Sequence, residues 1–194
     1  MIIIGLTGPT GSGKSTASKV AEKLGFQVID CDIVARKAVE KGTAGLSALV
    51  LAFGEDILNC DGTLNRKSLA QKAFSAPENT EKLNRTLLPH IVLMAQEEMT
   101  SEYVLLDAPT LFESGMQTEC DVTVAVLADI NIRLSRITAR DCISKEDALL
   151  RINAGKNDDY YKDRADYILY NNADTDDFIN EFERIITEIK SKGE

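Results

Sequence analysis

Short runs of consecutive apolar residues recur along the chain and predict strands that are buried on both faces. The first, Ile2–Leu6, lacks the polar alternation that a half-exposed strand would show. Later runs of the same character lie at Phe26–Asp30, Tyr103–Asp107, Val122–Leu127 and Tyr167–Leu169. We therefore expect an α/β fold in which helices cover both faces of a parallel five-stranded sheet.

Segments with helical periodicity lie between these runs, at Thr16–Leu24, Ile33–Lys41, Ile130–Arg140, Ser144–Ala154 and Phe178–Lys190. Gly25 follows the first of them, and glycine commonly ends helices because it adopts a left-handed backbone conformation. Ser144 is suited to N-cap the fourth, since Asp147 follows three residues later. The middle of the chain, Gly42–Thr100, is mostly helical without a long β-branched run, and we interpret it as an insertion between two strands.

Composition and charge narrow the classes of partner. The 194 residues are 44% hydrophobic and 27% charged, which is typical of one globular domain. The formal net charge is −9, and an acidic protein is poorly suited to bind the phosphate backbone of a nucleic acid. No apolar run approaches the ~18 residues that span a bilayer, and no basic leader precedes the first strand. We expect a cytoplasmic protein, monomeric or weakly self-associating, that binds neither membranes nor nucleic acids.

The four cysteines, Cys31, Cys60, Cys120 and Cys142, form no CxxC pair and so give no zinc or dithiol signature. Their spacing favours reduced structural thiols, as expected in the cytoplasm. Parallel sheets bind their ligands beyond the carboxyl ends of the strands, so we expect the functional residues there.

The strongest signal in the chain is Gly8–Ser15, which matches the P-loop pattern GxxxxGK[ST] between a predicted strand and a predicted helix. A triphosphate needs several N–H donors that point inward, so the backbone must curl tightly around it. Glycines at Gly11 and Gly13, with Ser12 between them, permit this curl and leave no bulky side chain in the way. The segment therefore predicts a binding site for ATP at the N-terminus of a helix.

The residues that close this loop carry the charge and the metal ligand. Lys14 is expected to reach the β- and γ-phosphates, and Ser15 to ligate Mg²⁺. Thr16 is placed one residue further along for the α-phosphate. Together these residues predict a magnesium-dependent enzyme that transfers the γ-phosphate of ATP to a small molecule.

Carboxylates end two of the predicted strands. Asp107 ends the strand YVLLD, where an aspartate of the Walker B type would hold Mg²⁺ or its waters. Asp30 and Asp32 end the second strand, and a carboxylate there is suited to accept the proton of an attacking hydroxyl. Asp32 is equally suited to N-cap the following helix, and the residues alone leave both roles open.

Several arginines and amides are weaker candidates. Arg133, Arg136 and Arg140 share one helix face, which indicates either a solvated basic stripe or, at Arg140, an arginine finger over the phosphates. Other candidates for contacts to an anionic substrate or a base are Arg36, Arg66, His90, Asn171 and Asn172. For each of these, an ordinary surface, capping or turn position is the alternative.

Taken together, the motifs resemble the dephospho-coenzyme A kinase family. The matching stretches are GLTGPTGSGKST, VIDCDIVAR, FGEDILNCDGTLNR, LDAPTLFESG, RITARD and ADYILYNN, in this order along nearly the whole chain. The chain departs from the family's usual pattern at Pro89-His90, where the two residues are swapped, at Thr110 in place of leucine, and at Gly155 in place of glutamine.

The resemblance implies a core sheet in residues 1–32, 103–139 and 165–194, a substrate-binding insertion in residues 33–102 and a lid in residues 140–164. It implies that Asp32 is the general base, that Arg140 is a catalytic lid arginine and that Asn172 lies in the loop beside adenine. Arg36, Arg66 and His90 become candidates for binding the substrate. The implied reaction phosphorylates the 3′-hydroxyl of the ribose of dephospho-coenzyme A, the last step of coenzyme A synthesis.

Two other functions fit a P-loop. A different small-molecule kinase, such as a nucleoside monophosphate kinase, would share the phosphate chemistry. A regulatory GTPase would show the guanine motif N-K-x-D, which is absent from the sequence. Such a switch would also have D-x-x-G after a strand, but here Thr110 stands where that glycine would be.

Overall fold

The predicted sheet is present. The computed structural model describes residues 1–172 and 174–193, and within them five strands form one parallel sheet in the order β2-β3-β1-β4-β5. The strands are β1 (Ile2–Thr7), β2 (Gln27–Asp30), β3 (Tyr103–Asp107), β4 (Val122–Leu127) and β5 (Tyr167–Tyr170). Each agrees with its predicted bounds to within about one residue, because a continuous apolar run between turn residues leaves little choice of position.

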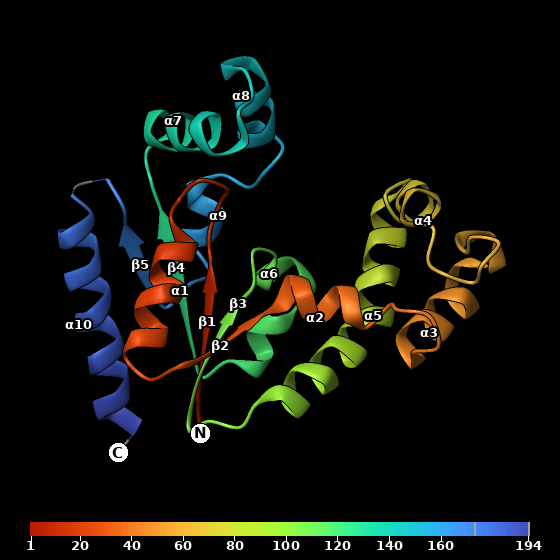
Figure 1. The fold of residues 1–194 in the computed structure, drawn as a ribbon, viewed down its shortest axis with the longest axis horizontal. Helices are drawn as coiled ribbons and strands as arrows, with labels where there is room; N and C mark the ends of the chain where they lie inside the picture. The colour runs from red at the N-terminus through yellow and green to blue at the C-terminus, as the bar shows by residue number, and fades with distance from the viewer. Residues whose placement is uncertain (173, 194) are drawn as a thin grey trace.

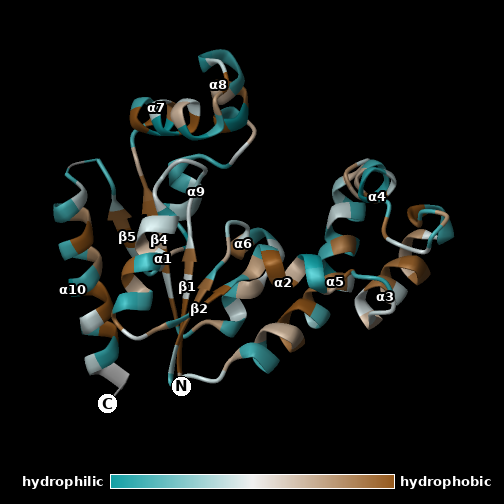
Figure 2. Ribbon diagram, viewed as in Figure 1, coloured by the Kyte–Doolittle hydropathy of each residue, from teal (hydrophilic) through white to brown (hydrophobic). Residues whose placement is uncertain are grey.

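Helices cover both faces of the sheet, as Figure 1 shows. Those nearest the strands are α1 (Lys14–Lys23), α2 (Cys31–Lys37), α5 (Pro77–Glu98), α6 (Leu111–Ser114), α9 (Asp158–Lys162) and α10 (Thr175–Gly193). Val20 of α1 and Phe182 of α10 belong to one buried core, and Val34 of α2 and Ile91 of α5 to another. Figure 2 shows β4 and β5 in the brown of hydrophobic residues, as expected for strands covered on both sides. No helix in residues 1–172 or 174–193 is long and apolar enough to cross a bilayer.

The insertion has an apolar core of its own. It contains α3 (Ala44–Phe53), α4 (Arg66–Ala73) and the short 3₁₀ turn η1 (Glu55–Ile57), beside the N-terminal half of α5. Leu49, Ile57 and Leu69 are buried at its centre. In Figure 1, α3 and α4 stand apart from the sheet. A second 3₁₀ turn, η2 (Met116–Glu119), precedes β4.

The start of α2 differs from the prediction. The helix begins at Cys31, earlier than expected, because Asp30 at the end of β2 caps it. Asp30 Oδ1 accepts hydrogen bonds from the backbone N–H groups of Asp32 at 2.9 Å and Ile33 at 3.1 Å. The capping role that we considered for Asp32 belongs to Asp30, so that alternative was wrong.

A pair of helices, α7 (Ile130–Asp141) and α8 (Lys145–Asn153), lies beyond the carboxyl ends of the strands (Figure 1). They pack on each other through Ile137, Ala148 and Ile152. Ser144 N-caps α8 as predicted, since its Oγ accepts a hydrogen bond from the backbone N–H of Asp147 at 3.0 Å.

Candidate active site

The phosphate loop joins β1 to α1 and depends on its glycines. Gly8, Gly11 and Gly13 have φ angles of 139°, 78° and 109°, which side chains strongly disfavour. A Cβ atom at Gly8 would collide with the carbonyl oxygen of Val126, and one at Gly13 with the amide group of Asn171. The glycines are therefore required by backbone conformation and by space.

Side chains from α7 and from the end of β5 support this loop from outside. Arg133 Nε donates to the Thr10 carbonyl at 3.0 Å, and Arg136 Nη1 donates to the Ser12 carbonyl at 3.2 Å. Asn171 Nδ2 donates to the same Ser12 carbonyl at 2.8 Å, and its Oδ1 accepts from Arg136 Nη2 at 3.0 Å. Arg133 is buried and Arg136 is half-buried, so the interpretation of a solvated basic stripe was wrong for both.

The neighbouring asparagine lies elsewhere. Asn172 is exposed and exchanges two hydrogen bonds with Asp129: its Oδ1 accepts from the backbone N–H at 2.7 Å, and its Nδ2 donates to Oδ1 at 2.8 Å. Asn171, by contrast, lines the cavity above the phosphate loop. The structure thus brings Asn171 to the wall of this cavity, and a position of Asn172 beside adenine stays a prediction.

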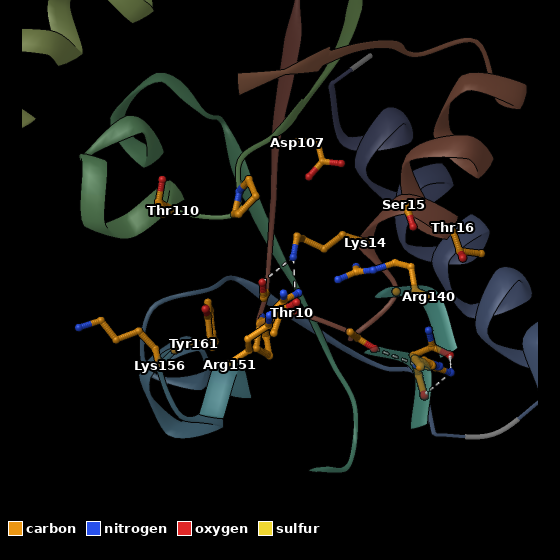
Figure 3. A pocket seen from close by; sticks show the side chains of 18 of the residues that line it. Thr10, Lys14, Ser15, Thr16, Asp107, Thr110, Arg140, Arg151, Lys156 and Tyr161 are labelled. Carbon is orange, nitrogen blue, oxygen red and sulfur yellow. Dashed lines mark hydrogen bonds between the residues drawn. The ribbon is translucent and has the colours of Figure 1, made fainter. Parts of the chain in front are cut away.

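Lys14 reaches from the loop into this cavity, whose volume is about 1240 Å³. Its Nζ donates to the carbonyls of Gly8 at 2.6 Å and Pro9 at 3.4 Å. Desolvation lowers the pKa of Lys14, while the nearby carboxylates of Asp107 and Asp32 oppose this shift. Figure 3 shows Lys14, Asp107 and Arg140 reaching into the same space. An anion that enters the cavity would take the place of the carbonyl oxygens that Lys14 contacts in this structure.

Asp107 and Ser15, the two residues predicted to hold Mg²⁺, line the same cavity. The sheet register places Asp107 of β3 beside Asp30 of β2, at the carboxyl edge of the sheet. Asp107 Oδ2 accepts a hydrogen bond from Ser18 Oγ at 2.7 Å, while Ser15 and Thr16 line the same cavity. No group of three or more His, Cys, Asp or Glu side chains suited to a metal lies within the described residues. One hydroxyl and one carboxylate nevertheless fit Mg²⁺, which is usually held by few side chains together with phosphates and water.

Replacing Asp107 by asparagine should separate stability from activity. Burial is the main cause that raises the pKa of Asp107. At a pH above this raised pKa the buried carboxylate is ionised, and its charge destabilises the folded state. This destabilisation decreases as the pH falls through the raised pKa. Asparagine keeps an acceptor for Ser18 without the charge. We expect the melting temperature of Asp107→Asn without ligand at pH 7 to equal or exceed that of the wild type. Its Mg²⁺-dependent turnover should fall by about 10²-fold or more. Thermal melts and activity at saturating Mg²⁺ test this, and a destabilised but active variant would contradict it.

Asp32 lies where two cavities meet. Asp32 is exposed in the first turn of α2. It lines both the cavity above the phosphate loop, called the phosphate cavity from here on, and a second cavity of about 350 Å³. The second cavity is otherwise lined by Ala35, Arg36, Val39, Leu64, Arg66, Leu69, Leu83 and Leu87. Asp32 is the one residue that lines both cavities among the residues that the structure describes. A hydroxyl presented from the second cavity would meet this carboxylate on its way to the phosphates.

Two of the three further residues predicted to bind the substrate lie in the second cavity, and the third lies outside it. Arg36 of α2 and Arg66 of α4 line the second cavity, although they are far apart in the sequence. His90 lines neither cavity. Its Cβ lies near Gly45 of α3, so it takes part in the contact between α5 and α3.

The phosphate cavity has lining residues that the sequence did not single out. Arg140 lines it, as expected, and so do Arg151, Lys156 and Glu113. Glu113 Oε2 is buried and has no hydrogen-bond partner among the described residues. The stretch LFES contains Glu113, but nothing in this stretch of sequence indicates that the side chain lines the cavity.

Known proteins resemble this chain over nearly its whole length. A family model described as dephospho-CoA kinase matches residues 2–177. A dephospho-CoA kinase of Listeria monocytogenes is 42% identical over 175 residues, which cover 87% of this chain and 88% of the relative. The solved structure of a Thermus thermophilus protein matches with a TM-score of 0.77 at 32% identity, covering 96% of this chain and 97% of that one. The dephospho-CoA kinase of Campylobacter jejuni matches with a TM-score of 0.66 at 25% identity, covering 99% and 98%.

Proposed function

The chain belongs to the dephospho-CoA kinase family, and from this premise we propose that it transfers the γ-phosphate of ATP to the ribose 3′-hydroxyl of dephospho-coenzyme A. The products would be coenzyme A and ADP, so the enzyme would complete coenzyme A synthesis. The observation that carries the proposal is the position of Asp32 between a cavity lined by the phosphate loop and a second cavity.

The second cavity has the chemistry of a suitable acceptor site. Its aliphatic side chains would accommodate an uncharged chain, while Arg36 and Arg66 would pair with phosphates. Dephospho-coenzyme A contains both kinds of group, a pyrophosphate and a pantetheine arm. A nucleoside monophosphate, the alternative acceptor, would leave the aliphatic lining without a partner.

In the proposed mechanism, Asp32 accepts or orients the proton of the attacking hydroxyl. Lys14 and Arg140 offset charge that develops on the transferred phosphoryl group. Mg²⁺, held by Ser15 and Asp107 together with the phosphates, would supply further charge stabilisation. Catalysis then consists mainly of positioning and electrostatics on a loop that Arg136 and Asn171 hold in place.

The division of the chain is part of the same proposal. Residues 33–102 would serve as the substrate-binding part and residues 140–164 as a lid, on a core sheet formed by the remainder. The separate apolar cluster of α3 and α4, and the small one between α7 and α8, support this division. A cytoplasmic location and a monomeric or weakly associating chain remain predictions from the sequence.

A coupled assay of ADP release tests the acceptor. Dephospho-coenzyme A, AMP, CMP and shikimate are compared at equal concentration with saturating Mg²⁺ and ATP. We expect kcat/KM for dephospho-coenzyme A to exceed that of each other acceptor by about 10³-fold or more, because only it fills the second cavity. Turnover of a monophosphate with none of dephospho-coenzyme A would replace this function by that of another small-molecule kinase.

A further inference from the structure

A cluster of charges lies where α7 ends, and two of its members, Asp141 and Arg151, have no role in the reaction as described so far. Asp141 accepts hydrogen bonds from Arg140 Nε at 2.7 Å and Nη2 at 2.9 Å, and from Arg151 Nη1 at 2.6 Å. The side chain of Asp141 is 19% exposed, against 60% for Arg140 and 54% for Arg151. A single, largely covered carboxylate thus joins two arginines that come from different helices.

The backbone brings this cluster together. Arg140 and Asp141 end α7, and Cys142 follows with a φ of 52°, a positive value that is shared by no other non-glycine residue in the described part of the chain. This uncommon conformation reverses the chain, so that α8 packs back on α7. Arg151 of α8 thereby comes to lie beside Asp141, ten residues away in the sequence.

Both arginines also face the phosphate cavity. Arg140 and Arg151 line it together with Lys14, and Figure 3 shows all three around one space. Nη1 of Arg140 and Nη2 of Arg151 donate to no group in residues 1–172 or 174–193. Neighbouring guanidinium groups repel each other, and a carboxylate between them offsets this repulsion. The arginines therefore lie side by side with N–H groups left over for an anion.

We propose that Asp141 is a positioning residue, which holds Arg140 and Arg151 as a pair whose remaining N–H groups receive the terminal phosphate of the nucleotide. The inference rests on the proposed function, because the cavity must hold a nucleoside triphosphate. Two long side chains that are already ordered lose less conformational entropy when the ligand binds. The hydrogen bonds from Arg140 lower the pKa of Asp141, so they favour the charged form that binds both arginines.

Nucleotide binding to the Asp141→Asn variant tests this role. Titration calorimetry in excess Mg²⁺ gives dissociation constants for ADP and for AMPPNP, a triphosphate that is not hydrolysed. We expect the ratio of the ADP constant to the AMPPNP constant to fall by about three- to tenfold, because the pair contacts the additional phosphate. General damage to the lid would weaken both nucleotides alike and leave this ratio unchanged.

Two further variants sharpen the test. Glu146→Gln removes a negative charge from the exposed first turn of α8 and should keep the wild-type ratio. In a background with Arg140→Ala and Arg151→Ala, Asp141→Asn should change the ratio by less than about twofold, because its effect passes through those arginines. An unchanged or increased ratio in Asp141→Asn, or an undiminished effect without the arginines, would overturn the proposal. The assay contains no acceptor, so a wrong acceptor leaves it intact, whereas failure of the wild type to bind AMPPNP would contradict the proposed function.

Discussion

Replacing Lys14 by alanine is expected to lower kcat by about 10³-fold, at the upper end of what the loss of one preorganised donor costs an enzyme. The Lys14 ammonium group is desolvated, lies among the loop carbonyls and reaches into the phosphate cavity. A charge in such surroundings acts on a developing negative charge more strongly than it would in water. ADP release at saturating ATP and acceptor measures the loss.

The loss of activity should not come from unfolding. Desolvation is the main cause that lowers the pKa of Lys14, so the protonated amine opposes folding, and this cost is removed only as the pH rises through the lowered pKa. The variant Lys14→Met, which keeps the length of the chain without the charge, should therefore melt at the wild-type temperature or above at pH 7. It should be as inactive as Lys14→Ala.

Lys19 provides the matched control. It lies on α1, as Lys14 does, but it is exposed and lines neither cavity. Lys19→Ala removes the same charge from the same helix and should keep turnover within about twofold of the wild type, as is usual for surface positions. Equal losses in the two variants would show that helix charge in general matters, and an active Lys14→Ala variant would overturn the assignment of the site.

The sequence predicted those features that depend on neighbours along the chain. The strands follow from local apolar runs, and the phosphate loop from a pattern of glycines whose φ angles only glycine tolerates readily. The start of α2 was missed because Asp30 and Asp32 are both chemically suited to cap a helix. Only the exact end of β2 decides between them, and element ends are the least certain part of such a prediction.

The remaining site features depend on contacts between distant segments. Arg133 donates to Thr10, 123 residues away, so the helix alone gave no sign that this arginine is buried. Asn171 and Asn172 are consecutive, and consecutive side chains after a strand point in different directions. One of them supports the phosphate loop and the other bonds to Asp129, a choice that requires the packed structure.

Replacing Asp32 by asparagine is expected to lower kcat by about 10²-fold or more, within the usual range for loss of a general base. Asparagine has the same shape but cannot take a proton from the attacking hydroxyl. The Asp32 carboxylate makes no hydrogen bond within the described residues, and Asp30 caps the helix in its place. The substitution should therefore leave the melting temperature unchanged, so that the fall in kcat reports on chemistry rather than on folding.

The Asp32→Asn variant should still bind ATP, and an exposed glutamate provides its matched control. The phosphate loop makes no contact that depends on the Asp32 side chain, so the ATP dissociation constant should stay within about threefold of the wild type. The small change would come from the loss of the electrostatic attraction between Asp32 and Lys14. Glu40→Gln, at an exposed position soon after α2, removes the same charge and should keep full turnover. If Asp32→Asn turned over at a near-normal rate, the carboxylate at the junction of the two cavities would not be the base. Proton acceptance would then have to come from another group, and the position shared by the two cavities would reflect substrate positioning alone.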